Sequence, residues 1–499
     1  MKTDVASGFS AHLGSVPVVG GDQRSRWSVG GIVPGVVALP RSVDQLAEVL
    51  GRASLEGWSV LPAGRGSWLG GGGLPSEADV VVSTGDMKKV VEYVPDDLTL
   101  TGGAGLALGR LASTTREHGQ WLAQDPPGWR ETTLGAFAAT GIPGPLVAGF
   151  GRPRDHLLGL TAVTGDGRIL RPGGKVVKNV AGFDLVRLLA GSWGTLGVIA
   201  SVTVRLFPLP RTEVTLLLEE RLGEGVPPAL LECARAWAVA PVVPEALELV
   251  VWSSDEERAG RATLAARLLG SPEEVAGKER ILREAAGGSE PRRVEGVESQ
   301  EFQDLLTRGP GARVRAGRDG GSGRGPRSSG GTDGGSALSI RLAALPARLG
   351  PVLEVAENLR SRAGATGCGT RIRASVTRGT VSVELSSDAT PDAAFPPKVW
   401  GPLLESSRAG MSRLGGNLTV LRSSRSLQDR ISARGPMGPA GALMEGIRKE
   451  LDPAGILAPG RLDGRTSKVR ELEADEMEGD ERSLSAEPAD VADMRESAS

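Results

Sequence analysis

Residues 62–73, with the sequence PAGRGSWLGGGG, form a glycine-rich stretch between two expected β-strands at residues 58–62 and 78–84. Consecutive backbone N–H groups in such a turn can form a concavity that binds anions. Glycine allows positive φ angles and lets a pyrophosphate approach the main chain. The stretch is not a G-x-G-x-x-G loop, because Leu69 occupies the third glycine position, and it lacks the Gly-Lys-Ser/Thr end of a P-loop. On this loop alone, a pyrophosphate site and a flexible turn both stay open.

The cysteines and histidines are too few and too scattered for a metal centre. Cys233 and Cys368 are isolated, whereas an iron–sulfur cluster normally needs four thiolates. The three histidines, His12, His118 and His156, match no zinc spacing. We therefore expect no iron–sulfur cluster and no metal in this chain. Two distant cysteines also give no disulfide framework, which favours a reducing, cytoplasmic location.

Charge and hydropathy argue against two classes of partner. The formal net charge of −2 at pH 7 argues against nucleic acid as the main partner. The N-terminus has no continuous apolar segment of the kind that signal peptides contain. Residues 188–204 are uncharged, but Gly191, Gly194 and Gly197 interrupt them, so we predict a helix end, a turn and a strand there. Any membrane contact would then come through a partner.

The chain divides into regions of different texture. Residues 1–28 look like a loose extension, and residues 29–212 alternate short strands with amphipathic helices. Within them, Ser42 and Gln45 form a capping box ahead of an amphipathic helix. Residues 213–440 are expected to form a second α+β domain.

In this second domain, residues 257–270 and 352–364 read as amphipathic helices and residues 380–386 as a strand. Residues 308–337, rich in arginine and glycine, cannot bury enough apolar surface to fold, and we predict a disordered insertion. The insertion is either a solvated loop, which we favour, or an RNA-binding segment. Residues 441–465 form a C-terminal segment of their own, and residues 466–499 form an acidic tail without apolar periodicity, expected to be disordered.

Several motifs together point to one family. Residues 175–199 read KVVKNVAGFDLVRLLAGSWGTLGVI, and residues 447–462 read IRKELDPAGILAPGRL. With the glycine loop and with residues 125–145 and 151–160, these motifs resemble the PCMH-type flavoproteins, also called the vanillyl-alcohol-oxidase type. Within that family they are most similar to the FAD-binding subunits of bacterial glycolate oxidases. The resemblance implies an α+β fold: a PCMH-type FAD-binding domain of two α+β subdomains, to which the C-terminal segment returns, plus a second, cap-like α+β domain.

The resemblance also implies which residues contact FAD. The pyrophosphate loop would comprise Gly64, Arg65, Gly66, Ser67, Trp68, Leu69 and Gly70. The segment along the flavin and ribityl chain would include Asp125, Pro126, Thr133, Leu134, Gly135 and Gly141, and Arg154 and Asp155 would lie near the nucleotide. Gly197, Val198 and Ile199 would belong to a strand whose main chain meets the adenine or the ring edge. Lys178, Asn179, Gly182 and Asp184 would shape the wall of the site, although Asp184 can equally cap the helix that follows it.

Three positions depart from the family pattern. Many members attach FAD through a loop histidine, but Ser67 occupies that place and cannot form the bond, so we expect non-covalent FAD. Leu146 replaces an arginine of the glycolate-oxidase subunits, and Ala458 replaces the asparagine of the closing motif. These two changes concern contacts near the flavin.

The substrate site departs further from related 2-hydroxyacid dehydrogenases. Their histidine-rich metal motif in the cap is absent, because every histidine of this chain precedes residue 157. Oxidising a 2-hydroxy acid requires a base for the hydroxyl proton and a cation for the carboxylate. Arg371 and Arg373 can meet a carboxylate, or they can be outward residues of one strand face, which the alternation favours. No catalytic residue is assigned.

The resemblance leads to a function with two rivals. The chain would be the FAD-binding subunit of a glycolate-oxidase-like complex, oxidising glycolate to glyoxylate and passing electrons to a second FAD subunit or an iron–sulfur subunit. It would lie in the cytoplasm, at the inner membrane only through these partners. The rivals are a free-standing FAD dehydrogenase or oxidase of another alcohol, and a scaffold subunit without catalysis.

Overall fold

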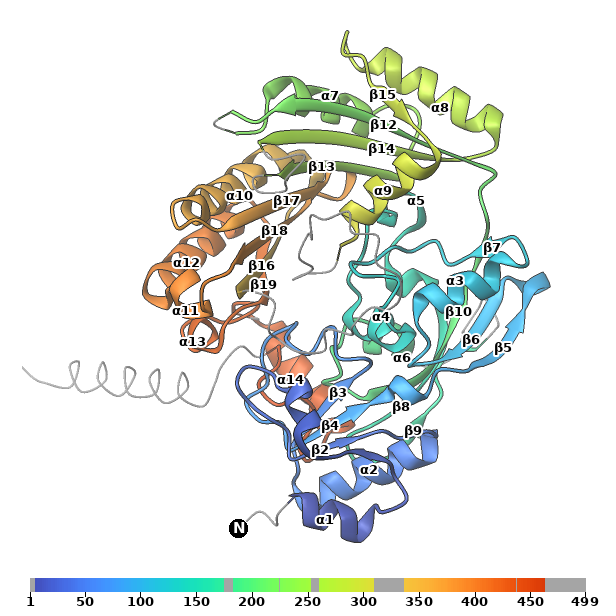
Figure 1. Cartoon of the computed structure of the whole chain (residues 1–499), viewed down its shortest axis with the longest axis vertical. Helices are drawn as coiled ribbons and strands as arrows, with labels where there is room; N and C mark the ends of the chain where they lie inside the picture. Colours follow the sequence, from blue (N-terminus) through green and yellow to red (C-terminus); the bar gives the residue numbers. More distant parts are fainter. Residues whose placement is uncertain are drawn as a thin grey trace, which may run out of the picture.

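The computed structural model of the chain describes residues 5–174, 183–223, 225–252, 260–308, 336–436 and 438–462. Figure 1 shows two smaller sheets in the lower and right part of the molecule and one large sheet across the top and left. Helices pack on all three sheets, and this mixed architecture confirms the α+β expectation.

The first sheet holds the glycine loop at the end of one of its strands. Its order is β1 (Val18–Val19), β2 (Val36–Ala38), β4 (Val80–Ser83) and β3 (Val60–Ala63). The last three strands are parallel, and the loop leaves β3 directly. The helix α2 (Val43–Glu56) begins as the capping box predicts, because the Ser42 hydroxyl accepts a hydrogen bond from the backbone N–H of Gln45 at 3.1 Å.

Two distant parts of the chain complete this sheet. Leu457 pairs with Val60 in parallel register, and the Val60 N–H donates to the Ile456 carbonyl at 2.8 Å. At the other end of the chain, residues 5–28 are not a loose extension. They form α1 (Val5–His12), β1 and the 3₁₀-helix η1 (Gly21–Trp27), because Phe9 is buried in the core beneath α2.

The second sheet is antiparallel throughout. Its order is β5 (Val90–Val94), β6 (Thr99–Gly103), β10 (Val198–Arg205), β8 (Leu157–Val163) and β9 (Ile169–Leu170), with β7 (Gln120–Trp121) and β11 (Phe207–Pro208) forming a separate pair. The helices α3 (Leu108–Arg116), α4 (Leu134–Thr140) and α6 (Leu185–Leu189) share its core through Leu111, Phe137 and Leu189. Asp184 caps α6, since its carboxylate accepts from the Arg187 N–H at 3.0 Å.

The third sheet has eight strands. Its order is β15 (Arg292–Val294), β12 (Thr212–Arg221), β14 (Arg261–Gly270), β13 (Ala246–Trp252), β17 (Gly369–Ser375), β18 (Thr380–Ser387), β16 (Ser336–Ala343) and β19 (Asn417–Arg422). One face packs against α7 (Pro228–Ala238), α8 (Pro272–Ala285), α10 (Leu349–Gly364) and α12 (Pro397–Arg413), which Figure 1 shows on its outer side. Trp237 and Trp400 fill this interface and are fully buried.

Of the two helices predicted for this domain, one is confirmed and the other is wrong. Residues 352–364 lie within α10 and residues 380–386 within β18, as predicted. Residues 261–270 form strand β14 instead of a helix. The strand is central, between β12 and β13, and nearly all its residues are buried, so it lacks the alternation that marks a half-exposed strand.

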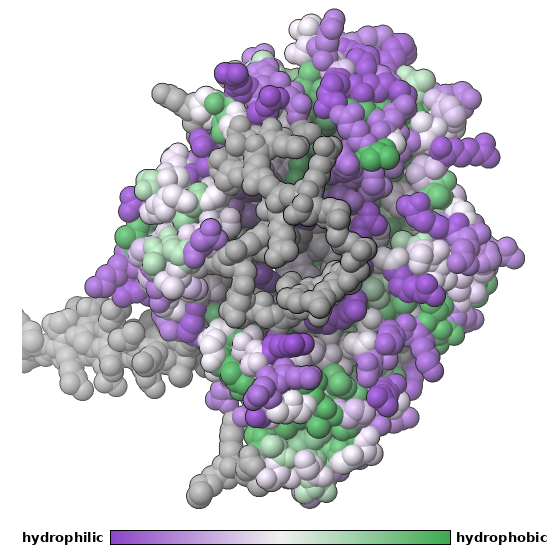
Figure 2. Space-filling model, viewed as in Figure 1, coloured by the Kyte–Doolittle hydropathy of each residue, from purple (hydrophilic) through white to green (hydrophobic). Residues whose placement is uncertain are grey.

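The remaining helices are short or peripheral: α5 (Val147–Phe150), α9 (Gly296–Leu306), α11 (Pro391–Ala394), α13 (Arg425–Gln428) and α14 (Ala440–Leu451). Where the surface is coloured in Figure 2, hydrophilic side chains dominate its upper and right parts, and apolar residues gather in its lower part. Among the described residues, no helix is long and apolar enough to cross a bilayer. The expected acidic tail and nearly all of the expected insertion lie outside the described residues.

Candidate functional site

The glycine loop forms one wall of a cleft between the first and second sheets. The opposite walls come from α4 and from the turn that leads into β10. The cleft is lined by Pro62, Ala63, Gly64, Arg65, Gly66, Ser67, Trp68, Leu69, Thr84, Gly135, Ala136, Ala139, Thr140, Trp193, Gly194, Gly197, Val198, Ile199 and Arg461. Motifs far apart in the sequence therefore meet at one place.

Close approach of neighbouring atoms explains glycine at several loop positions. A Cβ on Gly64 would lie 2.4 Å from Oγ1 of Thr133, the N-cap of α4. A Cβ on Gly72 would lie 2.5 Å from the indole of Trp193. Gly66 has a φ of +90°, which side chains rarely tolerate. The loop is therefore a defined structure held against α4 and Trp193.

Arg65 lines the cleft, but its charged group is engaged in an exposed ion pair outside it. It is 53% exposed and pairs with Glu131 at 2.9 Å. The loop itself is held from the cap side, where the Arg422 guanidinium donates to the Ser67 carbonyl at 3.0 Å. An anion in the cleft would thus meet main-chain groups of the loop.

Arg461, from the closing motif, supplies a buried positive charge to the cleft. Its side chain donates to the carbonyls of Gly73, at 3.3 Å, and of Leu69. Burial lowers the pKa of Arg461 to about 10. In the described part of the chain its guanidinium forms no ion pair with a carboxylate. A bare glycine cradle beside an uncompensated cation fits the pyrophosphate of FAD.

Two tryptophans connect this cleft to a second, larger cavity. Trp68 and Trp193 meet edge to face with their ring centroids 6.0 Å apart, and together with Thr140 they line both spaces. Trp193 has a φ of +56°, a conformation rare for a bulky residue. The aromatic pair therefore lies between the two spaces and borders both.

The second cavity has a volume of about 720 Å³ and lies between the large sheet and residues 141–147. One wall is the sheet face opposite the helices. The polar side chains that line the cavity as a whole include Arg152, Glu248, Ser339, Arg341, Arg373, Ser375, Arg378, Thr380, Ser382, Glu384, Asn417, Thr419, Arg422 and Arg434. Arg373 thus lies on one strand face, as the alternation indicated, and that face lines a cavity.

The cavity is rich in positive charge. Six arginines line it, against the carboxylates of Glu248 and Glu384. Glu384 is already paired with Arg371, whose Nε donates to it at 3.1 Å. Burial and the nearby charges of Arg373, Arg434 and Arg152 lower the pKa of Arg341 to about 10. The lining therefore favours an anionic ligand.

Glu248 is the candidate proton acceptor in this cavity. It is 1% exposed, and its carboxylate lies 3.9 Å from the Arg373 guanidinium. Burial raises the pKa of Glu248 to about 7, although Arg373 opposes the shift. Its Oε1 has no hydrogen-bond partner among the described residues. A carboxyl group that titrates near neutral pH inside a ligand-sized cavity is suited to acid–base work.

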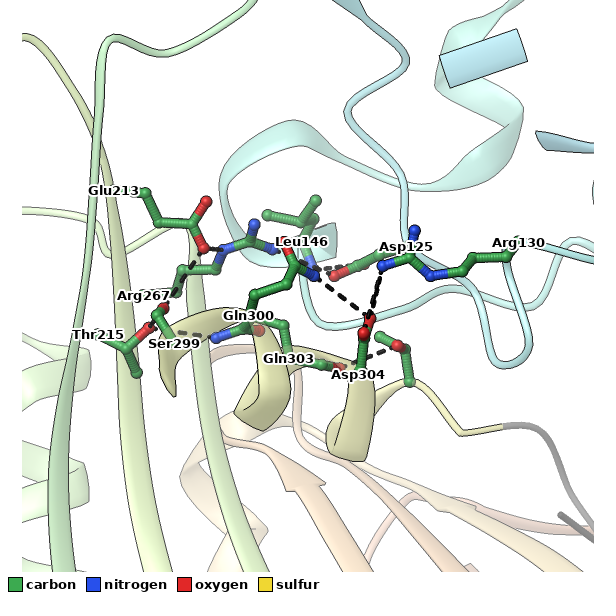
Figure 3. A network of polar contacts seen from close by, with 11 residues as sticks. Asp125, Arg130, Leu146, Glu213, Thr215, Arg267, Ser299, Gln300, Gln303 and Asp304 are labelled. Atoms are coloured by element: carbon green, nitrogen blue, oxygen red, sulfur yellow. Dashed lines mark hydrogen bonds and ion pairs between the residues drawn. The ribbon is translucent and has the colours of Figure 1, made fainter. Parts of the chain in front are cut away.

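Asp125 lies in a network that joins the two halves of the molecule (Figure 3). It is buried, accepts from the Leu146 N–H at 3.0 Å, and lies 3.6 Å from the Arg267 guanidinium on β14. Arg267 also donates to Glu213 at 2.9 Å. Burial raises the pKa of Asp125 to about 6. Asp125 lines neither cavity, so its observed contacts are structural.

The other expected FAD residues divide into two groups. The cleft gathers the loop from Gly64 to Leu69 together with Gly135, Gly197, Val198 and Ile199, while Gly141 lines the larger cavity. Gly70, Pro126, Thr133, Leu134, Arg154 and Asp155 line neither space. Leu134 is buried in the core of the second sheet, and the Asp155 carboxylate accepts a hydrogen bond from the Arg152 N–H at 2.9 Å. Lys178, Asn179 and Gly182 lie outside the described residues.

Sequence reasoning did not identify Arg461, Glu248 or the arginines of β16 and β19. Arg461 belongs to a motif that was recognised, so its position carried a signal. Glu248 lies in the otherwise apolar sequence ALELVVW, and a single carboxylate in such a sequence gives no signal of a functional role. Among the described residues, no group of three or more His, Cys, Asp or Glu side chains can hold a metal ion.

Comparison with known proteins identifies a domain and a fold. Residues 34–173 match the family model of an FAD binding domain, so the chain carries a PCMH-type FAD-binding domain. The fold of the whole chain resembles 4-ethylphenol oxidase from Gulosibacter chungangensis, with a TM-score of 0.70 at 16% identity, covering 93% of this chain and 98% of that one. p-Cresol methylhydroxylase gives a TM-score of 0.69 at 16% identity, with coverages of 92% and 96%.

Relatives by sequence include enzymes named for hydroxy acids. The chain is 35% identical over 216 residues to D-lactate dehydrogenase of Archaeoglobus fulgidus, covering 43% of this chain and 47% of the relative. It is 37% identical over 193 residues to glycolate oxidase subunit GlcE of Escherichia coli, covering 38% and 53%. D-2-hydroxyglutarate dehydrogenase of Xanthomonas citri is 33% identical over 199 residues, covering 40% and 42%. The match spans about half the length of these relatives.

Proposed function

We propose that this chain binds FAD without a covalent bond and oxidises a 2-hydroxy acid, in the manner of a glycolate oxidase subunit. The observation that carries the proposal is the adjacency of two sites. An anion-binding cleft in the FAD-binding domain shares Trp68, Thr140 and Trp193 with a cavity lined by arginines. A cofactor lying in the first can then meet a carboxylate substrate held in the second.

Each part of the site has a role in this scheme. The loop from Gly64 to Leu69 and Arg461 hold the pyrophosphate, and Thr140 and Trp193 face the passage to the substrate. FAD, when bound, supplies the acceptor for the hydride that leaves the carbinol carbon. Arg373 binds the substrate carboxylate, and Glu248 accepts the hydroxyl proton.

Non-covalent attachment follows from Ser67. A serine at this loop position cannot form the bond that a histidine makes with the flavin in related proteins. Acid precipitation of the holoprotein tests this, because yellow colour that stays with the pellet would contradict it. We also propose that the chain itself carries no iron–sulfur cluster, and iron and sulfide analysis of the pure chain checks this.

The electrons require an acceptor outside this chain. We propose a second FAD subunit and an iron–sulfur subunit of the same complex as partners, because one relative is named as a subunit of glycolate oxidase. The complex would be cytoplasmic and would meet the inner membrane only through those partners. Co-purification from the native host tests the assembly, and capture of the chain alone would contradict it.

The decisive experiment is anaerobic reduction of the bound flavin. Purified chain with about one FAD should bleach when glycolate, lactate or another 2-hydroxy acid is added. Bleaching of the isolated chain by a simple alcohol instead would favour a free-standing dehydrogenase of another alcohol. A chain that binds no FAD would be a scaffold subunit.

A further inference from the structure

The face of the large sheet toward the cavity carries two arginines in one transverse row. Arg373 on β17 and Arg341 on β16 both pair with Ser382, one from each side. Because neighbouring strands lie about 4.8 Å apart, the two arginine backbones are separated by roughly 9.5 Å. The row thus presents two cationic positions with a hydroxyl between them.

These two positions differ in their acidic neighbours. The guanidinium of Arg373 lies 3.9 Å from Glu248. Arg341 forms no ion pair with a carboxylate of the described residues, and the charged groups that act on it are Arg373, Arg434 and Arg152. The other carboxylate of the lining, Glu384, is engaged with Arg371. Arg341 is therefore a partly buried cation surrounded by like charges.

One substrate carboxylate would not balance this arrangement. A carboxylate on Arg373, beside the proton acceptor Glu248, leaves Arg341 uncompensated. Buried charges are normally paired, so a second anion is needed at the far side of Ser382. The cavity of about 720 Å³ has room for a ligand larger than glycolate.

We propose that the substrate is a 2-hydroxy acid with a second anionic group, a carboxylate or a phosphate, and that Arg341 and Ser382 bind this second group. The inference rests on the proposed function and narrows its substrate class. Arg373 positions the reacting end, and Arg341 selects for the distal charge.

Binding of compounds that cannot be oxidised tests this without turnover. Titration calorimetry on the FAD-loaded chain would compare acetate, glutarate and 2-phosphoglycolate. We expect glutarate or 2-phosphoglycolate to bind at least about tenfold more tightly than acetate, and the tighter of the two identifies carboxylate or phosphate as the distal group. Arg341→Gln should remove most of that difference while leaving acetate binding unchanged. Arg348→Gln is the matched control and should change nothing, because Arg348 is an exposed arginine in the 3₁₀-helix η5 (Pro346–Arg348) that follows β16.

Two outcomes would overturn the proposal. Equal affinity for acetate and for both dianions would show that no second anionic subsite exists. Equal weakening of acetate and dianions in Arg341→Gln would show that Arg341 acts on the common carboxylate. Both results are independent of the proposed oxidation, whose own failure appears as a flavin that no 2-hydroxy acid reduces.

Discussion

Glu248 shows how a single buried residue can set the chemistry of the site. Its carboxylate is enclosed, faces a cavity and lies near Arg373. Ionised, it can accept a proton, whereas its protonated form cannot. Since burial raises its pKa to about 7, flavin reduction by substrate should speed up as pH rises through 7.

The first prediction concerns this residue. Glu248→Gln should slow anaerobic flavin reduction by about 10²–10⁴-fold, the usual contribution of a general base, and should flatten the pH profile. Stopped-flow absorbance from pH 5.5 to 8.5 measures both. FAD content should stay at wild-type level, and the exposed Glu354→Gln should behave as wild type. A variant that keeps the wild-type rate would assign the proton to another group.

The second prediction concerns the glycine loop. Gly66→Leu places a side chain at a φ of +90° and in the space that the pyrophosphate requires. Loss of one charge-assisted hydrogen bond, about 1.5–3 kcal/mol, weakens FAD binding roughly tenfold or more. The ratio of flavin to protein absorbance after gel filtration measures it. Gly70→Ala is the control, because its Cβ would meet nothing within 4 Å. Full occupancy in Gly66→Leu would place the pyrophosphate elsewhere.

At the scale of elements, the sequence predicted those whose signals are local. The capping residues Ser42 and Gln45 mark α2, and the apolar face of residues 352–364 marks α10. Strand β14 gave the wrong signal, because burial on both faces removes alternation and its alanines and leucines favour helix.

The candidate site was likewise predictable only where its residues carry a local sequence motif. The glycine loop and the turn into β10 carry motifs, so their meeting in one cleft followed from the resemblance. The arginine row across β17, β18 and β16 depends on strand order and register. Neither can be read from one strand alone, since β16 pairs with β18 although β17 lies between them in sequence.

The third prediction concerns the closing segment after α14. Arg461 hydrogen-bonds the carbonyls of Leu69 and Gly73, and Arg461→Met would leave these groups without it. We expect a loss of stability of about 1–3 kcal/mol and weaker FAD binding, because the charge near the cleft is lost as well. Urea unfolding and FAD titration measure the two effects. Lys449→Met, an exposed change on α14, should alter neither. An unchanged FAD affinity in Arg461→Met would limit Arg461 to a structural role.

At the scale of the whole molecule, Asp125 and Arg267 join the FAD-binding half to the large sheet. The folded-state pKa of Asp125 is raised to about 6, above the value near 4 of an unfolded chain. The folded protein therefore holds a proton that the unfolded chain releases between these values. Its contribution to stability is complete below pH 4 and is lost as pH rises through 6.

The fourth prediction follows from that sign. Between pH 4.5 and 7.5, Asp125→Asn should lose less stability than wild type, by on the order of 2 kcal/mol, because this window covers about 1.5 of the roughly two pKa units that separate the unfolded and folded values. Denaturant unfolding at the two pH values measures the difference. The exposed Asp97→Asn should follow wild type. If Asp125→Asn and wild type show parallel pH dependence, the carboxyl is ionised in the folded state.

The pairing of Leu457 with Val60 has a consequence for biogenesis. The ribosome makes the glycine loop several hundred residues before it makes Leu457, which completes the sheet, and Arg461, which anchors the loop. Until those residues emerge, a nascent chain displays an unfinished cleft. We expect flavin to be captured only once Leu457 and Arg461 have left the exit tunnel.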